Sequence, residues 1–228
     1  MMKFPKPVLL HRRLSPVLLI LWMLASAGCF VERPPGHSFG HSHKQADKRS
    51  GKHLRYQEPE RDEWQKPEQV VAALNLQPGQ AVADLGAGTG YFTFRLAAAV
   101  GDTGQVYAVD IDQEMIDILD DQKIRKQAVN VKSVLAKEHD PLLPKPVGLI
   151  FAVNSTHHIK ERVDYFKNAA RYLKPGGRVA VVDFKEGAFR HFVKRQTLLD
   201  EFKAAGYTFV QEFDFLPKQN FMVFRWEQ

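Results

Sequence analysis

The stretch VADLGAGTGYFTF, residues 82–94, decides the fold. The apolar run Ala81–Leu85 stops at a cluster of glycines, and a stretch of good helix formers follows them. This order predicts a strand, a tight turn and a helix. The turn contains three glycines at alternate positions: Gly86, Gly88 and Gly90. Because glycine tolerates positive φ and has no Cβ, a ligand can approach such a turn closely, and Asp84 would place a carboxylate beside it. The stretch therefore predicts a site for a nucleotide-like cofactor.

The spacing of the glycines indicates which nucleotide is expected. A dinucleotide fingerprint requires G-x-G-x-x-G, whereas this turn reads G-x-G-x-G. Tyr91 stands where the third glycine of the dinucleotide motif belongs. A pyrophosphate site is therefore disfavoured. The alternative to a cofactor site is a glycine turn that only follows a core strand.

The segment Asp84-x-Gly86-x-Gly88-x-Gly90 resembles the first motif of the class I S-adenosylmethionine-dependent methyltransferases. In that family the acidic residue and the glycines hold the amino acid part of the cofactor. The resemblance implies that S-adenosyl-L-methionine is the cofactor and that the first motif binds it: Asp84, Gly86, Ala87, Gly88 and Gly90. No metal ligands are expected at this site.

A second acidic residue lies downstream, at the end of the predicted strand QVYAVD, residues 105–110. Asp110 follows Gly90 by the spacing at which an acidic residue meets ribose hydroxyls, and a carboxylate can accept both hydroxyl protons. This resembles the second motif of the family. The resemblance assigns Asp110, with Ile111 beside it, to the cofactor.

Further apolar runs complete an α/β pattern. They predict strands at 129–135, 147–153, 178–184, 208–213 and 221–226, and helices at 68–74, 160–173 and 192–205. The expected fold is a Rossmann-like, doubly wound sheet, mostly parallel, with an antiparallel C-terminal hairpin. In the family the loop after the third strand contacts the adenine. Glu138 and Asp140 are both candidates for that contact, and the sequence does not choose between them.

The segment NSTHH, Asn154–His158, follows the fourth predicted strand and is expected beside the transferred methyl group. Asn154 is assigned to the cofactor. The segment departs from the N-P-P-aromatic pattern of family members that methylate amino groups of nucleic acid bases or glutamine, so those substrates are disfavoured. His157 or His158 could take a proton from a hydroxyl or thiol, because histidine titrates near neutrality. The alternative is that one caps the next helix and the other packs.

The N-terminal region reads as an export segment. Residues 1–28 contain basic residues, the short apolar run 17–24 and small residues before Cys29, the one cysteine of the chain. Ser26–Cys29 resembles a bacterial lipoprotein signal, which implies lipidation of Cys29 and a membrane-anchored protein in the cell envelope, facing the periplasm or the exterior. The alternatives are an uncleaved anchor, or a start at Met23 that would give a cytoplasmic protein.

Residues 29–55 have a composition typical of a flexible tether. The tether contains four histidines, for which adventitious metal binding is favoured over a structured metal site: His37, His41, His43 and His53. The globular domain is expected at 56–228. Its first segment, 56–66 with Trp64, is interpreted either as a cover over the cofactor or as a surface lead-in.

The positive charge of the chain is concentrated in its N-terminal part. The formal net charge is +6, and residues 1–55 carry +8 of it, which leaves −2 for residues 56–228. A mildly acidic domain disfavours a nucleic-acid partner and favours a small-molecule substrate. Two other function classes stay open, namely a membrane-tethered protein that binds the cofactor without catalysis and a nicotinamide-dependent oxidoreductase.

Overall fold

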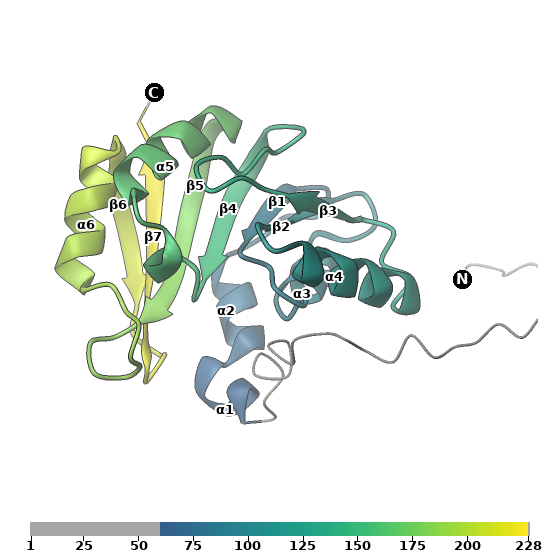
Figure 1. Cartoon of the computed structure of the whole chain (residues 1–228), viewed down its shortest axis with the longest axis horizontal. Coiled ribbons are helices and arrows are strands. Elements are labelled where there is room, and N and C mark those ends of the chain that lie inside the picture. Colours follow the sequence, from purple (N-terminus) through teal and green to yellow (C-terminus); the bar gives the residue numbers. More distant parts are fainter. Residues whose placement is uncertain (1–59, 228) are drawn as a thin grey trace, which may run out of the picture. The chain divides into compact units, whose positions relative to one another are not determined.

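The computed structural model describes residues 60–227, which belong to one compact unit built on a seven-stranded sheet (Figure 1). The strand order is β3-β2-β1-β4-β5-β7-β6. The strands are β1 (Ala81–Leu85), β2 (Gln105–Asp110), β3 (Val131–Leu135), β4 (Val147–Val153), β5 (Leu173–Phe184), β6 (Tyr207–Phe213) and β7 (Gln219–Trp226). Strands β1 to β5 pair in parallel, whereas β7 is antiparallel to both β5 and β6. The predicted fold class is confirmed, including the antiparallel hairpin at the end of the chain.

The helices cover both faces of the sheet, as a doubly wound fold requires. They are α1 (Arg61–Gln65), α2 (Pro67–Ala73), α3 (Thr93–Val100), α4 (Gln113–Arg125), α5 (Arg162–Ala169) and α6 (Arg195–Ala204), with 3-10 turns η2 (Thr156–His158) and η3 (Ala170–Tyr172). Apolar side chains of α2 and α3 pack in one buried cluster with strand residues such as Val82 and Phe151. Side chains of α5 and α6 pack in a second cluster with strand residues such as Ile150 and Val181. Because neighbouring strand residues point to opposite faces, these two clusters mark the two sides of the sheet.

The centre of the sheet determines where a ligand can bind. β1 pairs with β2 on one side and with β4 on the other, so the strand order reverses direction at β1 and β4. In open α/β sheets such a switch point leaves a crevice outside the carboxyl ends of the strands. The glycine turn follows the carboxyl end of β1, and the NSTHH segment follows the carboxyl end of β4. The fold therefore brings the two predicted parts of the site to one edge.

Some element boundaries differ from the sequence-based expectation. β3 begins at Val131, because the Asn130 side chain before it donates to the carbonyls of Ala97 and Gly101 at the end of α3. The predicted helix 160–173 is divided into the shorter α5 and the 3-10 turn η3. β5 begins at Leu173 and includes the LKPGG segment, because Leu173 already pairs with Val147 and a bulge absorbs the extra residues.

The expectations for residues 1–28, for Cys29 and for the tether 29–55 lie outside the described residues. Within residues 60–227, none of the helices combines the length and the apolar composition that crossing a membrane would require.

Candidate functional site

The glycine turn after β1 presents its backbone at the carboxyl edge of the sheet. The φ angles of Gly86, Gly88 and Gly90 are 73°, 54° and 87°. A Cβ added to Gly86 would lie 2.5 Å from the Cβ of Ser155, whereas one added to Gly88 would meet nothing within 4 Å. The turn is thus packed against the loop after β4 on one side and open at Gly88. This geometry fits a ligand that approaches the backbone closely.

Asp84 is buried beneath this turn, with 3% of its surface exposed. The Thr93 hydroxyl donates a hydrogen bond to Asp84 Oδ2 at 2.6 Å. Burial raises the pKa of Asp84 to about 6, and the Thr93 hydrogen bond acts in the opposite direction. The hydrogen bond between Asp84 and Thr93 therefore links β1 to the first turn of α3 and stabilises the glycine turn between them. A direct contact between Asp84 and the cofactor stays a prediction.

Asp110 lies directly against the glycine turn, although 22 residues separate it from Gly88. Its Oδ2 accepts the Gly88 backbone N–H at 2.8 Å, and its Oδ1 accepts the Asp112 N–H at 3.0 Å. Burial raises the pKa of Asp110, and the backbone N–H groups partly offset that effect. The next residue, Ile111, is 66% exposed and offers an apolar surface at the same edge. The first and second predicted motifs therefore form one continuous surface.

The two candidates for the adenine contact have different surroundings. Asp140 accepts hydrogen bonds from the Leu142 N–H at 2.9 Å and from the Tyr172 hydroxyl at 2.8 Å, and it also pairs with Arg171. Glu138 is exposed and has a long ion pair of 3.5 Å with Lys160. Through these contacts the Asp140 carboxylate stabilises its own loop. Glu138 has the more accessible carboxylate, and its role stays a prediction.

Asn154 belongs to a chain of side-chain amides that joins three elements. Its Oδ1 accepts from Gln219 Nε2 at 2.5 Å, and Gln219 Oε1 accepts from Gln65 Nε2 at 3.0 Å. Asn154 has a φ of 52°, a left-handed conformation that asparagine tolerates better than most residues. The amide chain links β4 through β7 to α1, so Asn154 holds the start of the NSTHH segment in place.

Helix α1 contacts the walls of the site. The Arg61 guanidinium lies 3.7 Å from the centre of the Tyr91 ring, and the Tyr91 hydroxyl donates to Asp62. On the other side, the Trp64 ring lies 5.8 Å from the ring of Phe184 at the end of β5. The segment around Trp64 therefore bridges the glycine turn and β5, and its interpretation as a cover over the cofactor stays a prediction.

His157 is held by a buried carboxylate at the carboxyl end of β5. Its Nδ1 lies 2.7 Å from Asp183 Oδ1, and its backbone N–H donates to Asp183 Oδ2 at 3.1 Å. The Asp183 carboxylate is fully buried and also accepts the Phe184 N–H and the Thr156 hydroxyl. Because a carboxylate only accepts hydrogen bonds, Nδ1 of the neutral imidazole carries the proton and Nε2 keeps a lone pair. This arrangement suits a proton acceptor.

Two further histidines surround His157. The ring centres of His158 and His191 lie 4.2 Å and 6.1 Å from that of His157. Burial and the neighbouring histidines lower the pKa of His158, which favours its neutral form. Among residues 60–227, no group of three or more histidine, cysteine or acidic side chains is placed to hold a metal ion. The rings of Phe184 and Phe189 stack on each other at 4.7 Å and add apolar surface beside the histidines.

Sequence reasoning missed Asp183, Thr93 and the amide partners of Asn154. A signal for Asp183 was present, because an acidic residue ends the otherwise apolar strand sequence RVAVVDF. A charged group is rarely buried without partners, so its position at a carboxyl end indicates a site residue. No comparable local pattern marks Gln65 or Gln219, whose partners are distant in sequence.

Comparisons with known proteins point to one family. Residues 82–177 match the family described as methyltransferase domain. The chain is 33% identical over 123 residues to a ubiquinone/menaquinone biosynthesis C-methyltransferase of Haemophilus ducreyi, a match that covers 53% of this chain and 47% of that protein. It is 33% identical over 114 residues to an arsenite methyltransferase of Halobacterium salinarum, covering 50% of this chain and 29% of the relative. The chain thus spans less than half the length of either relative.

Solved structures share the fold. A SAM-dependent methyltransferase from Aquifex aeolicus superposes with a TM-score of 0.69 at 23% identity, over 77% of this chain and 97% of that one. A magnesium protoporphyrin IX methyltransferase from Synechocystis, solved with bound SAM, superposes with a TM-score of 0.57 at 16% identity, over 72% of this chain and 80% of that one. Residues 82–177 therefore match the methyltransferase-domain family, and the described domain shares its fold with solved S-adenosylmethionine-dependent methyltransferases.

Proposed function

We propose that this protein is an S-adenosylmethionine-dependent methyltransferase that acts on a small-molecule acceptor through a hydroxyl or thiol group. The observation that carries the proposal is the His157–Asp183 pair at the carboxyl edge of the sheet. Ser155, two residues before His157, touches the glycine turn through a hydrogen bond of 2.9 Å to the Leu85 carbonyl. A proton acceptor and a cofactor turn are thus joined at one edge.

The residues present fit the cofactor. The open side of Gly88 allows close approach to the backbone, and Asp110 beside it can accept the ribose hydroxyls. The exposed face of Ile111 would lie against the base, and Glu138 would accept from its amino group. The cofactor supplies a methyl group bonded to a positively charged sulfur, which is already electrophilic. The protein must therefore orient the acceptor and exclude water, an effect worth up to about 7–11 kcal/mol.

His157 would remove the proton of the acceptor. Nε2 of His157 would accept the proton of the acceptor hydroxyl or thiol, while the cofactor, held at the glycine turn, would supply the methyl group and leave as S-adenosylhomocysteine. The Asp183 carboxylate stabilises the imidazolium that results, because it already accepts the Nδ1–H. The side chain of His157 is 4% exposed, and the Phe184 ring, which stacks on Phe189, lies 6.3 Å from its imidazole. These rings favour an acceptor with an apolar or aromatic body.

A panel of acceptors tests the proposal. Phenols, aliphatic alcohols, thiols and amines would each be incubated with the protein and S-adenosylmethionine, and S-adenosylhomocysteine formation would be measured. We expect turnover with at least one phenol or thiol and none with simple amines. Binding of the cofactor without turnover on any class would favour a binding protein instead. Preference for a nicotinamide cofactor would refute the methyltransferase function.

We also propose that the protein is anchored to the bacterial cell envelope through a lipid on Cys29. The support is the sequence alone: basic residues, a short apolar run and small residues precede Cys29. Mass spectrometry of the native chain should show acylation at Cys29 and loss of residues 1–28, and Cys29→Ser should leave the precursor uncleaved. An unmodified chain in the cytosol would contradict the proposal.

A further inference from the structure

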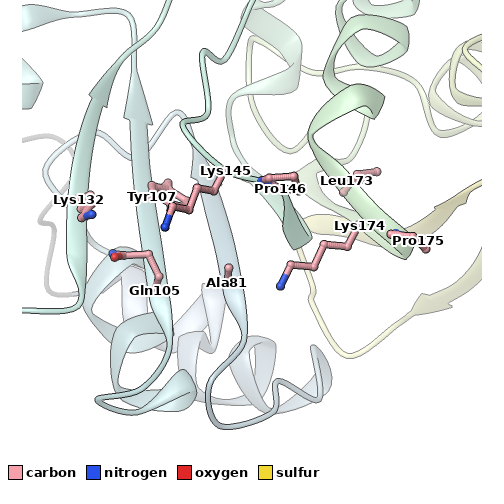
Figure 2. Close-up of a pocket in the computed structure, with 9 residues that line it drawn as sticks. All are labelled: Ala81, Gln105, Tyr107, Lys132, Lys145, Pro146, Leu173, Lys174 and Pro175. Carbon is pink, nitrogen blue, oxygen red and sulfur yellow. The ribbon is translucent and has the colours of Figure 1, made fainter.

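A second cavity lies at the opposite edge of the sheet from the glycine turn. It has a volume of about 530 Å³ and is lined at the starts of the parallel strands (Figure 2). Ala81 begins β1, Gln105 begins β2, and Leu173 begins β5. The glycine turn and the NSTHH segment follow the other ends of these strands. The cavity therefore belongs to neither the cofactor site nor the proposed acceptor site.

The charged residues that line this cavity are all positive. Three lysines line it and no acidic residue does: Lys132, Lys145 and Lys174. The lysines come from three segments, and Figure 2 shows Lys145 extended toward Tyr107 and Lys174 extended toward Ala81. Within residues 60–227 none of the three forms an ion pair, whereas Lys123, Lys160 and Lys194 each pair with a carboxylate. All three lysines are exposed, and such a gathering of positive charge attracts an anion.

Tyr107 provides a second, independent observation. It lines the same cavity and is 3% exposed, yet no residue of the described domain forms a hydrogen bond with its hydroxyl. A buried hydroxyl normally has a partner, so this one calls for an acceptor from outside the chain. Burial raises the pKa of Tyr107, which keeps the hydroxyl protonated and able to donate. The cavity thus offers three ammonium groups and one phenol hydroxyl as donors, beside the side-chain amide of Gln105.

We propose that this cavity binds the phosphate group of an anionic ligand. Several negatively charged oxygens on one centre match three ammonium groups and a phenol hydroxyl better than a single carboxylate does. Apart from Gln105, the remaining lining is apolar, so the body of the ligand packs against Ala81, Pro146, Leu173 and Pro175. A soluble phosphorylated compound and a phospholipid headgroup share this chemistry. The proposal does not depend on the methyltransferase activity.

The first test is calorimetric titration of the full chain with inorganic pyrophosphate. Lys145→Gln/Lys174→Gln should weaken binding roughly tenfold to a hundredfold, the effect of losing charge-assisted hydrogen bonds. Lys167→Gln/Lys203→Gln is the matched control, because these lysines are exposed on α5 and α6 and removing them changes the net charge equally. The control also accounts for anion binding by the basic N-terminal residues, which both variants retain. Tyr107→Phe, which keeps the ring, should weaken binding several-fold.

A second arm distinguishes the source of the phosphate. The same variants would be sedimented with phosphatidylglycerol vesicles and, for comparison, with neutral phosphatidylcholine vesicles. Pyrophosphate binding that is lost only in the Lys145/Lys174 variant indicates a soluble ligand. Anionic vesicle binding that is lost only in that variant, without pyrophosphate binding, indicates a lipid headgroup. If both lysine variants behave alike in both arms, the proposal is wrong. Affinity for S-adenosylmethionine should be equal in all variants. A result against the phosphate site therefore leaves the proposed methyltransferase function untouched.

Discussion

Replacing Asp183 by asparagine is the sharpest test of the proposed chemistry. The carboxylate accepts four hydrogen bonds, from the Thr156 hydroxyl, the His157 N–H and Nδ1–H, and the Phe184 N–H. An asparagine amide has nearly the same shape, but one of its two ends donates. If that end faces His157, Nδ1 must become the acceptor, and the proton moves to Nε2. His157 can then no longer take a proton from the acceptor.

The expected magnitude follows from this loss. Turnover should fall roughly 10²–10⁴-fold, the usual contribution of general base catalysis. The free energy of unfolding should fall by about 1.5–3 kcal/mol, since one charge-assisted hydrogen bond in a fully buried site is lost. Affinity for S-adenosylmethionine should change little, because Gly88 and Asp110 are on other loops.

The assay combines three measurements on the wild type, Asp183→Asn, His157→Gln and His158→Gln. S-adenosylhomocysteine formation would be followed across pH with an acceptor from the panel, cofactor affinity by calorimetry, and stability by urea unfolding. Turnover should be high in the wild type and in His158→Gln and low in Asp183→Asn and His157→Gln. A folded Asp183→Asn protein with wild-type turnover and pH profile would refute the role of the pair. Loss of turnover in His158→Gln alone would transfer the role to His158.

Two further predictions concern the cofactor edge. Asp110→Ala should weaken S-adenosylmethionine binding roughly tenfold to a hundredfold in calorimetry, as expected for a charged hydrogen-bond acceptor, and unchanged affinity in a folded variant would remove Asp110 from the site. Asp84 has a folded pKa of about 6 against an ordinary value of 3.8, so the folded state binds more protons between these values and its stability falls as pH rises through that window. Asp84→Asn should therefore gain about 3 kcal/mol relative to the wild type on going from pH 3.5 to pH 7, and equal pH dependence of the two proteins would contradict the shift.

The parts of the fold that the sequence predicts best are the buried parallel strands. β1, β2 and β4 are apolar runs bounded by turn residues, and their observed limits match the predicted ones. The same local signal places Asp84, Asp110 and His157 at carboxyl ends, because each follows such a run. Local patterns cannot show which groups meet across the sheet.

The choice between His157 and His158 illustrates that limit. Both histidines follow the same strand, and only Asp183, 26 residues from His157, distinguishes them. The lysine cavity could not be predicted for the same reason. Lys132, Lys145 and Lys174 belong to different segments that meet only in the folded sheet. Helix α1 has five residues and a polar sequence, so its helical structure depends on tertiary contacts rather than on propensity.

Helix α1 also couples the glycine turn to strand β7. Its Arg61 and Asp62 contact Tyr91 beside the glycine turn, and its Gln65 contacts Gln219 on β7. Five residues cannot stay helical without these contacts, so α1 leaves both walls in a single local unfolding step. That one step would remove the partners of Tyr91 and of Gln219 together, so the glycine turn and the amide chain of Asn154 would lose support at the same time.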